Sequence, residues 1–212
     1  DGLPMKNYQG SLPSNIFEST LSPGFIGETQ KTKVDTEVQR LYKITGDAAV
    51  LTNWSKYTSK GDLSFTNDGS TYTMSATEWE KYQKTRGQYS YSTLNTLIGS
   101  SAYKSMSDAE KSEAVSNIIG YAQDKAKREL VTSQGGNYAP PSTYSGAYYA
   151  EQAGISPETY YTYKSKTAKF EKVEQKITAI GNMGLTPKQQ TALVGTLYTS
   201  HDEDGNVTDE SL

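Results

Sequence analysis

Four segments of this chain begin with a Ser or Thr placed to cap an α-helix. A hydroxyl there accepts a hydrogen bond from a backbone N–H of the first helical turn, and a Glu or Gln three residues later can bond back. Proline at the first helical position already has a helical φ. The pattern therefore predicts a chain of short, separately capped helices. The four starts are Ser75-Ala-Thr-Glu78, Ser107-Asp-Ala-Glu110, Ser156-Pro157-Glu158 and Thr186-Pro187-Lys-Gln189.

Composition favours a thin core. Apolar residues make up 34% of the 212 residues, below the roughly 45–50% of an average soluble domain, a figure that includes glycine. Tyrosine supplies 17 of them, against four Phe and two Trp. A tyrosine hydroxyl must stay solvated or hydrogen-bonded, so this residue suits thin cores and protein interfaces. We expect an elongated helical body that needs a partner or neighbouring chain to cover part of its surface.

Charge and composition argue against several function classes. The formal net charge is -3, and the densest basic stretch, Lys125 to Arg128, is followed at once by Glu129. We therefore expect no specific binding of nucleic acid. The absence of cysteine excludes disulfides and thiolate chemistry, and no stretch approaches the ~18 apolar residues of a membrane span. The first residue is Asp1 rather than Met, so we expect a piece of a longer polypeptide.

The first third of the chain is predicted to hold an arm, a helix and a hairpin. Residues 1–30 are rich in Gly, Pro and Ser, and proline restricts the residue before it, which predicts an extended arm. Helical spacing of apolar residues predicts a helix over 34–44 that ends at Gly46. The turn signal Asn67-Asp68-Gly69, between two alternating segments, predicts a small β-hairpin.

The remaining elements predict a mainly α fold: a multi-helix domain with one small β-hairpin and an extended N-terminal arm. The domain is placed at 31–200, continuous but with a possible pinch at 134–142, where Gly and Pro cluster. Residues 201–212 are predicted to form a polar tail. The further helices are predicted at 75–87, 91–103, 107–130, 143–153, 157–163, 166–181 and 187–199.

Few side chains are suited to covalent chemistry. His201 is the only imidazole and lies beside a run of acids, whereas a catalytic histidine is held rigidly next to its nucleophile or carboxylate. Glycoside hydrolysis needs two carboxylates with separated pKa values on a pocket wall. The candidate acids mostly begin helices, where they complement the helix dipole, so we expect no enzyme activity and no cofactor. These acids are Asp47, Glu78, Glu80, Asp108 and Glu110.

One segment of the tail resembles the sequence of a calcium-binding loop. Asp202, Asp204 and Asn206 alternate before an apolar residue and are the candidate metal ligands. On that template the first and twelfth ligand positions fall on Ser200 and Ser211, and the twelfth needs a bidentate carboxylate. A charged turn is therefore favoured over a calcium site.

Tyrosines gather at 89–91, 144–149 and 160–163. Such clusters could stack on sugar rings or bases, but tyrosines spaced three to five apart on short helices are more typical of a thin core or a protein interface. Buried aromatic residues dominate interface energetics, so we select five interaction candidates. They are Trp54, Trp79, Tyr82, Tyr148 and Tyr149.

Six segments share a pattern of helix caps and core spacers. They are Glu37-Val-Gln-Arg40-Leu41, Met74-Ser75-Ala-Thr-Glu78-Trp-Glu-Lys81-Tyr82, Leu94 to Ile98, Ser101-Ala-Tyr103-Lys-Ser-Met106-Ser107-Asp108-Ala-Glu110-Lys111, Ile118-Ile-Gly-Tyr121-Ala122 and Gly184-Leu185-Thr-Pro-Lys-Gln189-Gln190. The pattern, over about residues 34–200, resembles a helical module of very large phage and prophage proteins of Gram-positive bacteria, described as minor structural, tape-measure-like or polyvalent proteins. The resemblance implies a structural or delivery role in a virion and brings no catalytic residues.

These observations predict a non-enzymatic structural or protein-interaction domain of a phage or prophage virion-associated protein. Its partners would be other virion proteins or copies of itself, in the virion or in the host cytoplasm during assembly. Two alternatives remain open. One is a cell-wall or polysaccharide-active enzyme domain of a phage protein, with two carboxylates and aromatic platforms around a cleft. The other is a phage-encoded inhibitor that binds a host protein.

Overall fold

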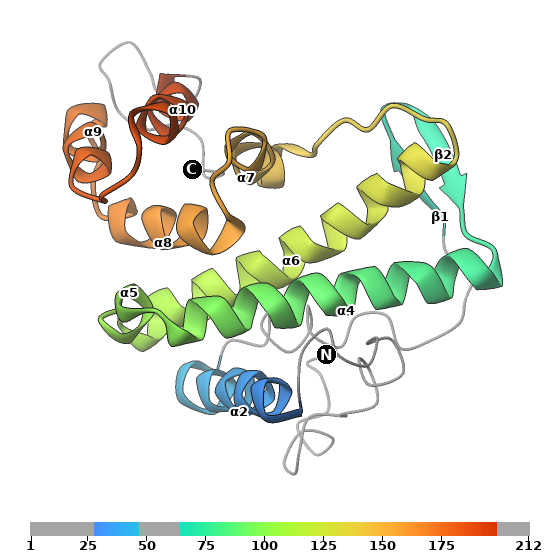
Figure 1. Ribbon diagram of the computed structural model, residues 1–212, viewed down its shortest axis with the longest axis horizontal. Helices are drawn as coiled ribbons and strands as arrows, with labels where there is room; N and C mark the ends of the chain where they lie inside the picture. The colour runs from blue at the N-terminus through green and yellow to red at the C-terminus, as the bar shows by residue number, and fades with distance from the viewer. Residues whose placement is uncertain (1–27, 47–63, 199–212) are drawn as a thin grey trace. The chain divides into compact units, whose positions relative to one another are not determined.

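A computed structural model of the chain describes residues 28–46 and 64–198 (Figure 1). These residues form eight helices and one two-stranded antiparallel sheet, which confirms the predicted fold class. The chain divides into two compact units, Asp1–Ala139 and Pro140–Leu212. The boundary lies inside 134–142, where the sequence predicts a possible pinch within one continuous domain. None of the described helices combines the length and apolar character needed to cross a bilayer.

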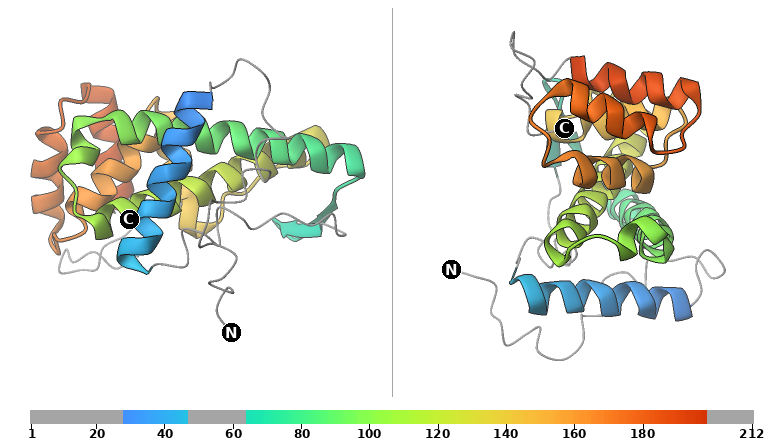
Figure 2. Two further views of the ribbon diagram at one scale, coloured as in Figure 1. Left: turned by 90° about the horizontal axis from the view of Figure 1, so that it is seen from below. Right: turned by 90° about the vertical axis from the view of Figure 1, so that its left-hand side faces the viewer.

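Three long helices form most of the first unit: α2 (Glu28–Thr45), α4 (Ala76–Gly99) and α6 (Asp108–Ser133). Helices α4 and α6 lie side by side, joined through the short α5 (Ser101–Lys104), and α2 crosses both (Figure 2). The apolar stripe predicted for 107–130 faces this interior and is buried. It comprises Val115, Ile118, Ile119, Ala122, Ala126 and Leu130.

Helix α2 begins earlier than the predicted 34–44. Its apolar residues Val34, Val38 and Leu41 are buried as expected, and Lys31 is buried one turn before them. The aliphatic stem of a lysine can cover apolar surface while its ammonium group reaches outward. The buried stripe therefore continues through a residue that counts as charged in the sequence.

The predicted break near Gly87 is wrong. Helix α4 runs unbroken through this buried glycine, although glycine costs a helix about 1 kcal/mol relative to alanine. Packing along α6 offsets that cost. The helix ends at Ser100 instead, whose Oγ accepts a hydrogen bond from the Tyr103 N–H over 3.1 Å and so starts α5.

The predicted hairpin is confirmed. Strands β1 (Ser64–Asn67) and β2 (Ser70–Thr73) pair with Phe65 opposite Tyr72. The two turn residues, Asp68 and Gly69, have φ values of 48° and 72°. Positive φ at both central positions is the geometry that a two-residue turn between twisted strands requires.

All four predicted helix starts are confirmed. Ser75 and Ser107 form complete capping boxes at the starts of α4 and α6. Ser156 caps α8 (Pro157–Thr167), and Thr186 caps α10 (Pro187–Tyr198) by accepting from the Gln189 N–H over 3.3 Å.

The second unit contains α7 (Ser142–Gln152), α8, α9 (Val173–Gly181) and α10. Helix α8 packs on α7 and α9, and α10 packs on the same two. The predicted single helix over 166–181 is wrong, because α8 ends at Thr167 and α9 starts only at Val173. Thr167 bonds back to the Tyr163 carbonyl over 2.8 Å, and its own carbonyl accepts from the Phe170 N–H in a turn.

Candidate functional site

Tyrosine hydroxyls of the first unit are used to hold carboxylates. In four described pairs the hydroxyl donates to an Asp or Glu that is between 14 and 66 positions away in the sequence. Such a bond satisfies the hydroxyl at the edge of a thin core, as buried polar groups require. The pairs are Tyr89 with Glu129, Tyr91 with Asp35, Tyr103 with Glu37, and Tyr138 with Asp124.

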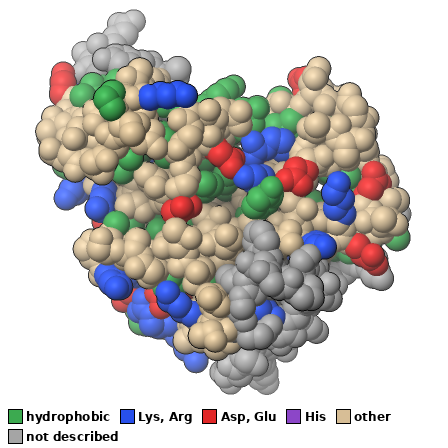
Figure 3. Space-filling view, in the orientation of Figure 1, with side chains coloured by type: hydrophobic (Ala, Val, Ile, Leu, Met, Phe, Trp, Pro, Cys, Tyr) green, Lys and Arg blue, Asp and Glu red, His purple; other side chains and the backbone are tan. Residues whose placement is uncertain are grey.

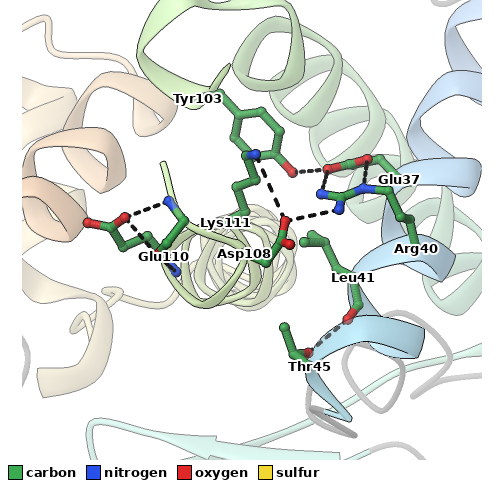
Figure 4. A network of polar contacts seen from close by, with 9 residues as sticks. Glu37, Arg40, Leu41, Thr45, Tyr103, Asp108, Glu110 and Lys111 are labelled. Atoms are coloured by element: carbon green, nitrogen blue, oxygen red, sulfur yellow. Dashed lines mark hydrogen bonds and ion pairs between the residues drawn. The ribbon is translucent and has the colours of Figure 1, made fainter. Parts of the chain in front are cut away.

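One of these pairs belongs to a network that joins α2 to α5 and α6 (Figure 4). The Arg40 guanidinium binds Glu37 through two bonds, Nε to Oε2 and Nη2 to Oε1, each 2.7 Å long. Its Nη1 reaches Asp108 Oδ1 at 2.9 Å. The Tyr103 hydroxyl donates to Glu37 Oε1 over 2.6 Å, and Lys111 Nζ lies 3.9 Å from Asp108 Oδ1. The network therefore connects three helices through one arginine.

Three groups of this network, Glu37, Arg40 and Tyr103, have pKa values shifted away from neutral pH. Burial tends to raise the pKa of Glu37, but hydrogen bonds from Arg40 and Tyr103 outweigh it and leave the pKa below its ordinary 4.5. The bond to Glu37 raises the pKa of Arg40 further. Burial and the same carboxylate raise the pKa of Tyr103. None of these three groups is poised to transfer a proton near pH 7, so the arrangement is suited to holding helices together.

A second tyrosine–carboxylate pair has different surroundings. The Tyr138 hydroxyl donates to Asp124, which is only 5% exposed. The Arg128 guanidinium lies over the rings of Tyr121 and Tyr138, at 5.9 and 5.7 Å from their centroids. Burial raises the pKa of Asp124 above 3.8, and the Tyr138 bond and the charges of Arg128 and Lys127 only partly oppose it.

Among the pockets formed by described residues, two lie along α6 in the first unit. The larger, about 290 Å³, is lined by Thr45 of α2 and by one face of α6. Its lining is small and polar and includes a single carboxylate. The α6 residues are Ala109, Ser112, Glu113, Ser116 and Asn117.

The smaller pocket, about 100 Å³, contains a pair of carboxylates, Glu78 and Glu129, beside Tyr82. Glu78 is used elsewhere: it accepts from the Ser75 N–H and from Gln134, both over 2.8 Å, and the Ser75 bond lowers its pKa. A glycosidase acid needs a raised pKa, and ligand pockets usually exceed roughly 300 Å³. Of this pair, Glu78 caps α4 and Glu129 accepts the Tyr89 hydroxyl.

Two of the predicted interaction residues are used in the core. Trp79 and Tyr82 of α4 are 7% and 3% exposed, and their rings stack with centroids 5.7 Å apart. They form a small cluster with Ala126, and Met74 packs against it. Their exposure leaves little surface for a partner. Trp54, a third candidate, lies outside the described residues.

The other two candidates lie together on α7. The Tyr148 and Tyr149 rings meet edge to face, with centroids 5.2 Å apart. Tyr148 is half-buried, whereas Tyr149 is 58% exposed. Among the described residues, Tyr149 and Ile44, which is 56% exposed, are the two exposed large hydrophobic side chains. On the face drawn in Figure 3, acidic and basic side chains are mixed rather than separated by sign.

The candidate metal ligands Asp202, Asp204 and Asn206, together with His201, lie outside the described residues. Within 28–46 and 64–198, no group of three His, Cys, Asp or Glu side chains could hold a metal ion. The carboxylate Asp47 also lies outside these ranges. The calcium-loop prediction therefore stays a prediction.

Sequence reasoning missed a pair of buried lysines in the second unit. Lys164 of α8 and Lys176 of α9 are both buried. Burial lowers the pKa of Lys176 below 10.5, and the positive charge of Lys164 lowers it further. In the sequence both belong to an ordinary charged stretch, so only the packing of α8 on α9 brings them together.

Comparisons with protein-family models, with curated proteins and with solved structures found no match to this chain.

Proposed function

We propose that this chain is a non-enzymatic protein-interaction domain of a phage or prophage virion-associated protein, and that it binds through α7. The observation that carries this proposal is the exposure of Tyr149. The tyrosines of the neighbouring helix, Tyr160 and Tyr161, are almost completely buried, so a large exposed ring is unusual for this unit. Tyrosine is enriched among the residues that dominate interface energetics.

The α7 surface offers a short stripe around that ring. Tyr148, Tyr149 and Gln152 follow Ser145 at helical spacing, and each is at least partly exposed. Covering the exposed part of Tyr149 contributes about 2 kcal/mol at the usual value for buried apolar area. A stable interface covers about 800 Å² on each partner, so neighbouring surface must join this stripe in the complex.

The resemblance to large phage proteins supplies the biological setting of the proposal. Partners would be other virion proteins or further copies of this chain, met in the virion or in the host cytoplasm during assembly. Three carboxylates of the first unit, Glu37, Glu110 and Glu129, are bonded to tyrosines, to an arginine or to the backbone N–H of a helix cap. The network and caps thus favour a structural use of these acids over a catalytic one.

Sedimentation velocity over a range of concentrations tests the self-binding form of the proposal. Tyr149→Ser removes the exposed ring of α7, and Ile44→Ser removes an equally exposed apolar side chain from α2 as the matched control. We expect the unmodified protein to self-associate. This self-association should weaken strongly in Tyr149→Ser and stay unchanged in Ile44→Ser. Equal association of all three proteins would contradict a role for α7.

Site-directed photo-cross-linking identifies a partner other than the chain itself. A photoreactive phenylalanine analogue is placed at position 149 and, as a control, at position 44, in cells producing the phage. We expect a cross-link specific to position 149 that joins the chain to a protein of the purified particle. A specific cross-link to a host protein would instead support the inhibitor alternative. No specific cross-link, together with no self-association, would overturn the proposal.

A further inference from the structure

The segment that follows α6, residues 134–139, is fastened to the first unit along its length. At its start, Gln134 Nε2 donates to Glu78 Oε1 over 2.8 Å and to the Thr73 carbonyl over 3.3 Å. Gly136 lies directly against the Tyr72 ring, so closely that a Cβ added there would be 2.2 Å from the Tyr72 hydroxyl. The first half of the segment is therefore held by the start of α4 and by strand β2.

The second half of the segment is held by two further contacts. The Ala139 N–H donates to Asn67 Oδ1 over 2.9 Å, and Asn67 Nδ2 donates to the Ala139 carbonyl over 2.7 Å. The Asn67 amide thus pairs with the Ala139 backbone as a neighbouring strand would. One residue earlier, Tyr138 bonds the buried Asp124 of α6.

The hairpin depends on this segment as much as the segment depends on the hairpin. A lone two-stranded hairpin is only marginally stable in water, and here each strand has only four residues. Its contacts with 134–139 are supplemented by Lys127 of α6, whose Nζ lies 5.3 Å from the centroid of the Phe65 ring. Hairpin and segment should therefore open together.

We propose that the hairpin, Asn67 and the Tyr138–Asp124 bond form a clasp that holds residues 134–139 on the first unit and limits the free link to the second unit. The boundary between the units follows Ala139, and Pro141 already occupies the N-cap position of α7. With the clasp closed, the link is Pro140 and Pro141, with a reach of about 7 Å. With the clasp open, 134–141 become free and the reach rises to about 27 Å.

This inference is independent of the proposed function. It concerns how far the second unit can move from the first, whatever that unit binds. Because proline fixes its own φ and restricts the residue before it, the closed link is short and stiff. A clasp of this kind would control the range over which a binding surface on the second unit can search.

Amide hydrogen exchange of Ala139 tests the clasp directly, because its N–H donates to Asn67. Asn67→Ala removes both bonds to Ala139, and Tyr138→Phe removes the bond to Asp124. The matched control is Tyr89→Phe, which removes another tyrosine–carboxylate bond on α6. We expect Ala139 and the β2 amides to exchange about three- to tenfold faster in both clasp variants and unchanged in the control.

Two outcomes would overturn the clasp. Rapid exchange of Ala139 in the unmodified protein would show that the contacts are not maintained. Unchanged exchange in Asn67→Ala would show that Asn67 does not hold the segment. If Asn67→Ala fails to fold, as circular dichroism reports, Asn67→Asp keeps the acceptor for Ala139 N–H and should show a smaller acceleration.

The length of the free link is tested by pulsed electron spin resonance. The chain has no cysteine, so Lys84→Cys and Lys188→Cys give one label in each unit on exposed positions. We expect the distribution of distances between the labels to broaden in Asn67→Ala and to stay unchanged in Tyr89→Phe. Equal widths in all three proteins would contradict the proposed limit on the link.

Discussion

The network at Glu37 and the clasp at Asp124 use the same three kinds of side chain to opposite electrostatic effect. In both, a carboxylate accepts a tyrosine hydroxyl while an arginine lies nearby. Yet the pKa of Glu37 is lowered and that of Asp124 is raised. The same composition therefore produces one carboxylate whose charge the fold favours and one whose charge the fold opposes.

The difference comes from where the arginine points. Arg40 meets Glu37 with a bidentate pair of bonds, which strongly favours the ionised carboxylate. Arg128 lies over two aromatic rings, its Nη2 donates to the Tyr121 hydroxyl over 3.3 Å, and its charge only partly opposes the effect of burial on Asp124. Burial then decides the outcome at Asp124, because desolvation penalises the charged form. A contact between charges has to be judged by geometry rather than by proximity.

Breaking the network should have the largest effect on stability. Arg40→Met leaves two carboxylates, Glu37 and Asp108, without their shared cation. We expect a loss of about 2 kcal/mol in the free energy of unfolding, below the full value for a buried pair because Arg40 is partly exposed. Urea denaturation measures it. Lys43→Met, which removes an exposed cation from the same helix, is the control, and an equal loss in that variant would contradict the special role of Arg40.

Neutralising Glu37, as in Glu37→Gln, should lower the free energy of unfolding by about 1.5 kcal/mol at pH 7. Its lowered pKa means that the folded state binds the proton less tightly than the unfolded state. The stability from this group is therefore present above pH 4.5 and is lost as the pH falls through the folded pKa. Urea denaturation from pH 7 to pH 3 should show the difference between the protein and Glu37→Gln shrinking. A difference independent of pH would exclude this explanation.

Adding a methyl group to the clasp at Gly136 should have a smaller effect on stability. In Gly136→Ala the new methyl group meets the Tyr72 ring, and the ring must turn aside at a cost of about 1 kcal/mol. Without the Tyr72 ring there is nothing for the new methyl group to meet. In the Tyr72→Ala background, Gly136→Ala should therefore leave the stability nearly unchanged. Thermal unfolding of the four proteins of this double-mutant cycle measures the coupling. Additive effects would mean that the close approach is not maintained in solution.

Neutralising Asp124 should have the smallest effect on the free energy of unfolding. The small effect would contrast with the larger loss expected at Glu37. Asn still accepts the Tyr138 hydroxyl, and the weaker bond is offset by the removal of a buried charge, so Asp124→Asn should change the free energy of unfolding at pH 7 by less than about 0.5 kcal/mol. Since the pKa of Asp124 is raised, its charge costs stability as the pH rises from 3.8 through the folded pKa. Asp124→Asn should lack this decline in stability with rising pH. A large loss in Asp124→Asn at pH 7 would contradict the assignment.

Features set by neighbouring residues were predictable from the sequence. A cap depends on residues three apart, as at Ser75 and Ser107, and the hairpin turn depends on Asp68 and Gly69. Errors arose where the three-dimensional structure departed from the local pattern. Gly87 lies inside a continuous helix, and α8 ends at Thr167, within the range predicted as a single helix.

The contacts that define the network and the clasp could not be read from the sequence. Arg40 and Asp108 are 68 positions apart, and Asn67 and Ala139 are 72 apart. Aromatic residues posed a different difficulty, because helical spacing marks a buried face without saying what covers it. Trp79 and Tyr82 face the interior of their own unit, whereas Tyr149 is exposed.

The carboxyl groups themselves provide the most direct measurement. Carbon-13 NMR of the two side-chain carboxyls, followed from pH 7 to pH 2 in one sample, reports both pKa values under identical conditions. We expect Glu37 to titrate below its ordinary pKa of 4.5 and Asp124 above its ordinary pKa of 3.8, so that the two groups shift in opposite directions. Titration of both groups near their ordinary values, or shifts of both pKa values in the same direction, would contradict the contrast between network and clasp.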